Sequence, residues 1–136
     1  MIEFFGKYEA SPGVYHITLG GMESHLIDTS EMSLEKVSYI QYCLNAAFND
    51  GMKTYKEYID IMDKFWRINK TPEFPKVAYH VSEKSPGLWY VKDKIFPIPY
   101  DEFCETSLCV AEKFRKILKR IHMNGYMLQK NSDYYE

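Results

Sequence analysis

The sequence is poor in cysteine, in charge of one sign and in long hydrophobic runs, and each lack excludes a class of protein. Three cysteines, an odd number spread over 136 residues, do not make a disulfide framework. With 17 basic and 19 acidic residues the net charge is -2, so neither a strongly basic nucleic-acid binder nor an acidic DNA mimic is indicated. Polar residues break every apolar stretch well short of the roughly 18 residues that span a bilayer. We therefore expect a cytoplasmic chain that neither enters a membrane nor binds nucleic acid nonspecifically.

Sequence motifs for catalysis are also missing. The chain has no P-loop, no GxGxxG dinucleotide motif, no HExxH zinc motif, no GxSxG nucleophile motif and no CxxC pair. Cys43, Cys104 and Cys109 are expected to be structural rather than reactive. We therefore expect no cofactor and favour a protein that is not an enzyme.

Aromatic residues are the compositional excess, since 12 Tyr, 8 Phe and 2 Trp make 16% of the chain. A tyrosine combines a large apolar ring with a polar tip, which suits half-buried surfaces and interfaces. The alternative is that these rings fill the core of a small domain. The abundance of Lys, Asn, Ile, Tyr and Phe is also typical of an AT-rich genome, such as that of a low-GC bacterium or its phage.

The N-terminal part is predicted to form strands separated by glycine turns. Residues 2–5 are a short strand that ends at Gly6, and a turn signal follows at residues 11–13. The predicted strands 14–19 and 22–27 then flank Gly20-Gly21, which supplies the positive φ angles of a tight hairpin turn.

This hairpin brings two histidines together. A two-residue turn places His16 opposite His25, with Glu23 on the same face. Two imidazoles and a carboxylate at this spacing can hold a metal ion, so these three residues are a candidate metal site. The alternative is a solvated or hydrogen-bonded histidine pair, because nothing in the spacing encodes a closed coordination shell.

A pair of helices is predicted next. Residues 28–31 have the D-x-x-E form of a capping box and Ser33 is a second candidate cap, so a helix begins here, with Gly51 as its stop. Residues 54–57 form another capping box, which opens a second, amphipathic helix that ends before Pro72.

From residue 77 the hydrophobic period changes to two, which predicts a three-stranded meander. Its strands cover residues 77–82, 88–91 and 95–98, with Pro86-Gly87 in the first turn. Both faces are apolar, so the sheet is covered twice or offers one face to a partner. One face holds Tyr79, Val81, Trp89, Val91 and Ile95, and the other holds His80, Leu88, Tyr90 and Phe96.

The longest predicted helix runs from Asp101 to about Met123 and stops at Gly125, which leaves residues 126–136 as a C-terminal tail. The fold class is therefore α+β with antiparallel strands, in one domain over residues 1–125: a Gly-Gly hairpin, an αα pair, the meander and a long C-terminal helix. The inward residues of the last helix are Phe103, Val110, Phe114, Ile117 and Ile121, with Leu108, Ala111 and Leu118 widening the stripe.

The αα-βββ-α order is similar to that of GNAT-type acetyltransferases. That family cradles the coenzyme pyrophosphate on a Gly-rich turn between its central strand and the next helix. Here residues 96–102 hold no glycine and present carboxylates where phosphate would sit. We therefore expect no coenzyme A chemistry.

The last helix also carries a basic face, with five cations and no acid over residues 113–120. Such a face can bind phosphates or an acidic partner. The alternative is that the cations complement the helix dipole, because Asp101, Glu102 and Glu105 stand at the start of the same predicted helix.

Two classes of function remain open. We expect a binding module of regulator or inhibitor type that binds a protein or a second copy of itself through surplus aromatic surface. The alternative is an enzyme or binder acting on a phosphorylated or nucleotide-like small molecule, with the basic helix as phosphate clamp and the histidine pair as acid/base or metal site. The candidate binding residues are His80, Tyr90, Phe96, Tyr39, Tyr42, Tyr55, Lys116, Lys119 and Arg120.

Overall fold

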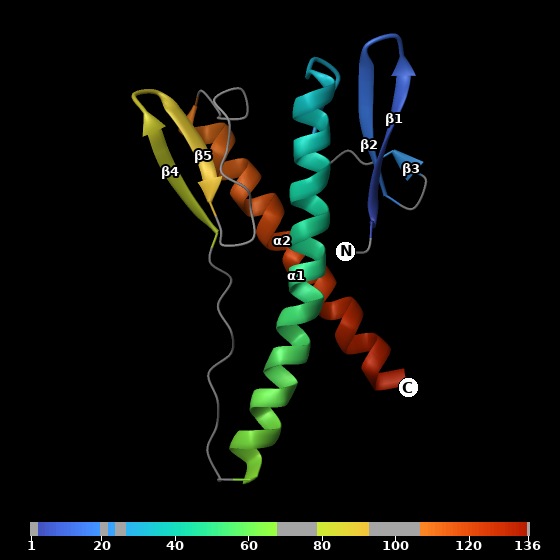
Figure 1. Ribbon diagram of the computed structural model, residues 1–136, viewed down its shortest axis with the longest axis vertical. Coiled ribbons are helices and arrows are strands. Elements are labelled where there is room, and N and C mark those ends of the chain that lie inside the picture. Colours follow the sequence, from blue (N-terminus) through green and yellow to red (C-terminus); the bar gives the residue numbers. More distant parts are fainter. Residues whose placement is uncertain (1–2, 20–21, 24–26, 68–78, 93–106, 136) are drawn as a thin grey trace.

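Two long helices cross, and a small antiparallel sheet lies on either side of α1 (Figure 1). The computed structural model describes the chain except residues 1–2, 20–21, 24–26, 68–78, 93–106 and 136. Within the described residues the fold is α+β with antiparallel sheets. The elements are β1 (Phe5–Ser11), β2 (Val14–Leu19), β3 (Met22–Glu23), α1 (Leu34–Arg67), β4 (His80–Ser85), β5 (Leu88–Lys92) and α2 (Leu108–Tyr135).

The first sheet has the strand order β1-β2-β3. β1 and β2 are joined at Gly13, whose φ of 78° is the left-handed conformation that this turn requires. The prediction of a strand ending at Gly6 was wrong, because β1 begins at Phe5 and runs through this glycine. A Cβ on Gly6 would lie 2.8 Å from the hydroxyl oxygen of Thr18 on β2, so glycine makes room for the threonine here and does not end the strand.

Two predicted sheets, the Gly-Gly hairpin and the meander, lie partly outside the described residues. β3 pairs with β2 in the expected register, with Leu19 opposite Met22 and Thr18 opposite Glu23. The Gly20-Gly21 turn and His25 lie outside the described residues, as does the predicted third strand of the meander. The rest of the meander is the two-stranded sheet of β4 and β5, in which Val81 lies opposite Val91.

The predicted αα pair is wrong, because α1 is a single helix of 34 residues that passes through Gly51. It begins at the second candidate cap, where the hydroxyl of Ser33 accepts a hydrogen bond of 3.2 Å from the backbone N–H of Lys36. Asp28 instead accepts hydrogen bonds from the N–H and hydroxyl of Ser30, which makes a turn before the helix. The 54–57 box caps nothing, since Thr54 donates its hydroxyl to the carbonyl of Asp50 inside the helix.

α2 also continues through its glycine, and residues 126–135 are helical rather than a tail. Its N-terminal cap is Ser107, whose hydroxyl accepts a hydrogen bond of 3.1 Å from the N–H of Val110. Leu118 and Ile121 are buried as predicted, whereas Val110 is 45% exposed and was wrongly placed on the inward stripe. Because one helix replaces the αα pair, the element order that resembled GNAT-type acetyltransferases is not present.

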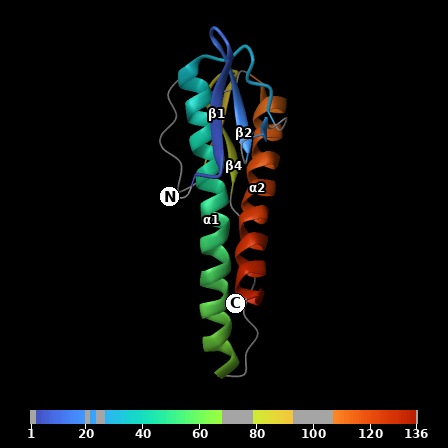
Figure 2. The same ribbon diagram turned by 90° about the vertical axis from the view of Figure 1, so that its right-hand side faces the viewer.

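The hydrophobic core lies between the helices and the two sheets (Figure 2). Each large side chain that is fully buried there contributes about 1.5–3 kcal/mol. No helix among the described residues is long and apolar enough to cross a membrane. The buried core residues are Phe5, Ile17, Val37, Ile40, Cys43, Leu44, Ala47, Phe48, Tyr79, Val91, Leu118 and Ile121.

Candidate functional site

The helices cross where each contributes a glycine. A Cβ added to Gly51 on α1 would lie 1.9 Å from the carbonyl oxygen of His122, and one added to Gly125 on α2 would lie 2.0 Å from the carbonyl oxygen of Phe48. Carbon and oxygen atoms that are not bonded do not approach so closely, so any larger residue would push the helices apart. The two glycines therefore allow the backbones of the two helices to touch. The sequence analysis had predicted that each glycine ends a helix.

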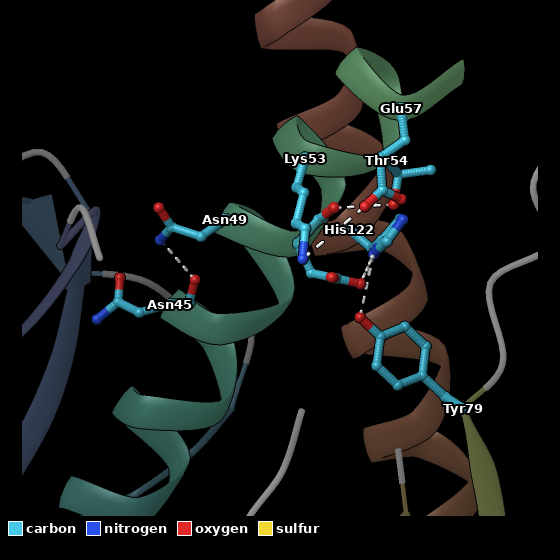
Figure 3. Close-up of polar contacts among 8 residues, drawn as sticks. Asn45, Asn49, Lys53, Thr54, Glu57, Tyr79 and His122 are labelled. Carbon is cyan, nitrogen blue, oxygen red and sulfur yellow. Dashed lines mark hydrogen bonds and ion pairs between the residues drawn. The ribbon is translucent and has the colours of Figure 1, made fainter. Parts of the chain in front are cut away.

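A buried polar cluster sits at this crossing (Figure 3). The side chain of His122 on α2 is 3% exposed, and its Nδ1 lies 3.2 Å from the hydroxyl of Tyr79 and 3.4 Å from the Oδ2 of Asp50. Asp50 belongs to α1, and Tyr79 precedes β4 directly. The cluster therefore joins three separate parts of the chain around one imidazole nitrogen.

The chemistry of this cluster follows from the two protonation states of the imidazole. When the ring is neutral with its proton on Nε2, Nδ1 can accept a hydrogen bond from the Tyr79 hydroxyl. When the ring is charged, Nδ1–H can donate a hydrogen bond to the carboxylate of Asp50. The same pairing of histidine with aspartate serves acid–base catalysis in enzymes, but there the imidazole must reach a substrate. At 3% exposure His122 reaches none, so this cluster positions the helices.

Two further polar contacts near the crossing are local to α1 (Figure 3). Asn49 donates its side-chain amide to the carbonyl of Asn45 at 2.8 Å, one helical turn earlier. Lys53 and Glu57 approach to 3.8 Å, with both side chains more than half exposed. These contacts join residues four apart in the same helix, so they do not connect α1 to another element.

A second polar network, made by Asn45 and Gln41, connects β1 to α1. The buried side chain of Asn45 accepts hydrogen bonds of 2.8 Å from the backbone N–H groups of Phe4 and Phe5 and donates one of 2.9 Å to the carbonyl of Phe5. Gln41 donates to the same carbonyl at 3.0 Å and accepts from the ammonium of Lys7 at 2.8 Å. Asn45 and Gln41 therefore occupy the hydrogen-bonding positions that a neighbouring strand would fill at this end of β1.

An open hollow of about 320 Å³ lies between β1 and α1 beside this network. Among its lining side chains Lys7 and Gln41 hydrogen-bond each other and Asn45 binds the backbone of β1, and the hollow carries one acid and one base. We see no group in it that is aimed at a ligand. The lining residues are Glu3, Lys7, Ser38, Gln41, Tyr42 and Asn45.

The candidate binding residues do not form one surface. Tyr42 is 43% exposed beside the hollow, whereas Tyr55 is buried and packs edge to face on Tyr126 with ring centroids 5.2 Å apart. His80 is exposed and Tyr90 half-buried on the sheet of β4 and β5, across α1 from β1 and β2 (Figure 1). Tyr39 is half-buried and packs against the core. Phe96 lies outside the described residues.

The basic face of α2 is present in the structure. Lys116 and Arg120 are exposed and Lys119 is half-buried, while Arg115 is bound to Glu112 at 3.1 Å. The acids at positions 101, 102 and 105 lie outside the described residues, so the helix-dipole interpretation of this face stays a prediction.

The candidate metal site is only partly described. The ring of His16 on β2 lies 5.7 Å from that of Tyr8, and His25 and the side chain of Glu23 lie outside the described part of the chain. Among the side chains that the structure does describe, no three of the His, Cys, Asp and Glu types gather as a metal site would require. The metal site therefore stays a prediction.

The two cysteines that the structure describes differ in burial, since Cys43 is buried and Cys109 is exposed. Burial raises the pKa of the Cys43 thiol to about 12, so the nucleophilic thiolate is scarce at neutral pH. Cys109 is exposed near the start of α2.

No protein-family model, curated protein or solved structure matches the chain. The function must therefore be inferred from its own geometry.

The sequence did not predict the residues that make the buried polar contacts between separate parts of the fold. No sequence motif includes Asn45, Asp50 or His122. Each of them acts through a contact with a residue far away in the chain. A weak signal existed for Asn45, a polar residue in the middle of the apolar run from Cys43 to Phe48.

Proposed function

We propose that this chain is a non-enzymatic module that binds another protein, of the regulator or inhibitor type. The support comes from a contrast in exposure. His122, the histidine that lies against an aspartate among the described residues, is buried in the helix crossing, whereas large apolar side chains are exposed on the helices. Binding between proteins uses exposed apolar surface, and catalysis needs polar groups that converge on an open cleft.

The observation that carries this proposal is a set of exposed apolar side chains at and beyond the crossing. There the two helices diverge (Figure 1). We call these residues the arm surface. Their exposed fractions range from 38% to 43%, which is high for side chains of this size and polarity. Methionine is flexible and adapts to differently shaped partners, so two methionines here favour a binding role. The arm surface comprises Ile59, Met123, Met127 and Leu128.

The test is co-purification from the organism that encodes the chain. The variant Met123→Glu/Met127→Glu introduces two charges on the arm surface, and Lys130→Glu is the matched control on an exposed residue of the same helix. We expect the native chain and the control to co-purify with a stoichiometric protein that the double variant loses, at unchanged melting temperature. A native chain that purifies alone, or a double variant that keeps the partner, would contradict the proposal.

Binding of a phosphorylated small molecule is the alternative, supported by the exposed Lys116 and Arg120 on α2. A ligand that binds the folded chain raises its melting temperature by mass action. A panel of nucleotides in a thermal-shift assay, with Lys116→Glu as control variant, distinguishes the two functions. Under the protein-binding proposal we expect no shift with any nucleotide.

A further inference from the structure

Among the described residues, β1 is an edge strand whose outer side is unpaired for part of its length. It pairs with β2 on one side only, and no described strand lies on the other (Figure 2). The side chains of Lys7, Tyr8 and Glu9 in the middle of β1 are exposed. An edge with unpaired backbone groups is a template for pairing with another chain.

The contacts of Asn45 reveal which backbone groups point outward. Asn45 binds both the N–H and the carbonyl of Phe5, so at this residue the backbone faces away from β2. In an antiparallel pair the hydrogen-bonding direction alternates from residue to residue. The N–H and carbonyl groups of Lys7 and Glu9 therefore also point outward, whereas those of Tyr8 point toward His16 on β2.

The length of the open edge is limited at both ends. At Phe5 the amides of Asn45 and Gln41 already occupy the outward backbone groups. Beyond Glu9 the register with β2 shifts, so the strand is irregular between Glu9 and Ser11. The open stretch therefore presents the backbone groups of two residues, Lys7 and Glu9.

This stretch is complementary to itself. Outward-facing residues must pair with outward-facing residues, so an antiparallel pairing of two β1 strands can be centred on Lys7, Tyr8 or Glu9. A centre on Lys7 or on Glu9 places like charges directly opposite, which is unfavourable. A centre on Tyr8 places each Lys7 opposite the other copy's Glu9, on both sides of the twofold axis.

We propose that two copies of the chain associate through their β1 edges, antiparallel and centred on Tyr8, to form one continuous sheet. Each copy supplies its three strands. On either side of the axis, Lys7 of one copy and Glu9 of the other form two backbone hydrogen bonds, each residue donating its N–H to the carbonyl of its partner. The two Tyr8 rings, each 41% exposed, meet on the opposite face from the charges. A twofold contact of this kind is closed, so the assembly stops at a dimer.

The existing contacts of the charged side chains leave room for this pairing. The ammonium of Lys7 donates to Gln41 and has further protons to give. The carboxylate of Glu9 accepts a hydrogen bond from Tyr15, and a carboxylate has four acceptor positions. The contact lies on β1 and not on the arm surface, so it goes beyond the proposed function and can fail independently of it.

The test is a charge-swap series on the full chain, measured by sedimentation velocity over a range of concentrations. Lys7→Glu alone and Glu9→Lys alone place like charges opposite one another twice, so we expect each to weaken dimerisation about tenfold or more. The double variant Lys7→Glu/Glu9→Lys restores opposite charges and should dimerise like the native chain. Lys113→Glu on the exposed face of α2 is the control for charge alone and should have no effect.

Amide hydrogen exchange gives a second readout. In the dimer we expect the amides of Lys7 and Glu9 to be protected, and in the single variants to exchange freely while the amide of Tyr8 stays protected by β2. A native chain that is monomeric at every concentration overturns the proposal. So does a dimer that survives both single reversals, or one that the double swap does not restore.

Discussion

Replacing Gly125 with alanine separates two opposite expectations for the stability of this chain. Glycine inside a helix is less favourable than alanine by about 1 kcal/mol, so helix propensity alone predicts that the variant is more stable. The structure predicts the reverse, because the added Cβ would lie 2.0 Å from the carbonyl oxygen of Phe48. Ordinary contact needs about 3.4 Å, so the helices must separate by about 1.4 Å or bend.

The cost of this separation is at the upper end of what overpacking produces, about 3 kcal/mol, since backbone atoms cannot rotate away as a side chain can. Subtracting the gain in propensity leaves a net loss of about 2 kcal/mol in the free energy of unfolding. Separation also lengthens the contacts of His122 with Asp50 and Tyr79, which span the same crossing.

The assay is urea denaturation followed by circular dichroism, with Asn124→Ala as the control on an exposed neighbour in α2. The control should change stability by no more than its propensity. Gly51→Ala should act like Gly125→Ala, and the double variant should cost less than the sum, because helices already separated need not move again. A Gly125→Ala variant as stable as the native chain would refute this account of the crossing.

Three further predictions concern buried polar and titratable groups. Tyr79→Phe removes the hydroxyl that meets His122 and should lower the free energy of unfolding by about 1 kcal/mol in urea denaturation, and a variant as stable as the native chain would show that this contact is idle. Asn45→Ala should cost about 2 kcal/mol and speed amide exchange at Phe5, because it leaves one buried and one partly buried N–H group without the side-chain acceptor; unchanged exchange at Phe5 would contradict the role of the Asn45 amide. Burial raises the pKa of the Cys43 thiol from 9.0 to about 12, so between these values the unfolded chain binds fewer protons and stability should fall as pH rises, by up to about 1.4 kcal/mol per pH unit. Cys43→Ala should lose that part of the pH dependence in urea titrations, and an identical slope in both proteins would show that this thiol titrates normally.

Local signals in the sequence predicted much of the secondary structure. The Pro-Gly turns at residues 12–13 and 86–87 connect paired strands, and both glycines adopt the positive φ angles that such turns need. Ser33 caps α1 as one of the two predicted caps. These features depend on residues a few positions apart, so the sequence contains all of the relevant partners.

The polar contacts between separate parts of the fold could not be predicted in the same way. Asn45 acts on Phe5, 40 residues earlier in the chain, and Tyr79 meets His122, 43 residues later. Hydrogen-bonding groups at such separation carry no spacing rule, because any buried donor can be matched by any acceptor that the fold brings near.

The sequence by itself determined that the strands turn at Pro-Gly pairs, that the residues on either side of Gly51 within 34–67 and residues 108–123 are helical, and that the class is α+β. Only the tertiary structure decided what Gly51 and Gly125 do. A residue without a Cβ suits both a helix end and a point where two backbones touch, and no local pattern distinguishes these uses. The choice depends on whether another helix packs there, and here α1 and α2 each supply the surface that the other's glycine accommodates.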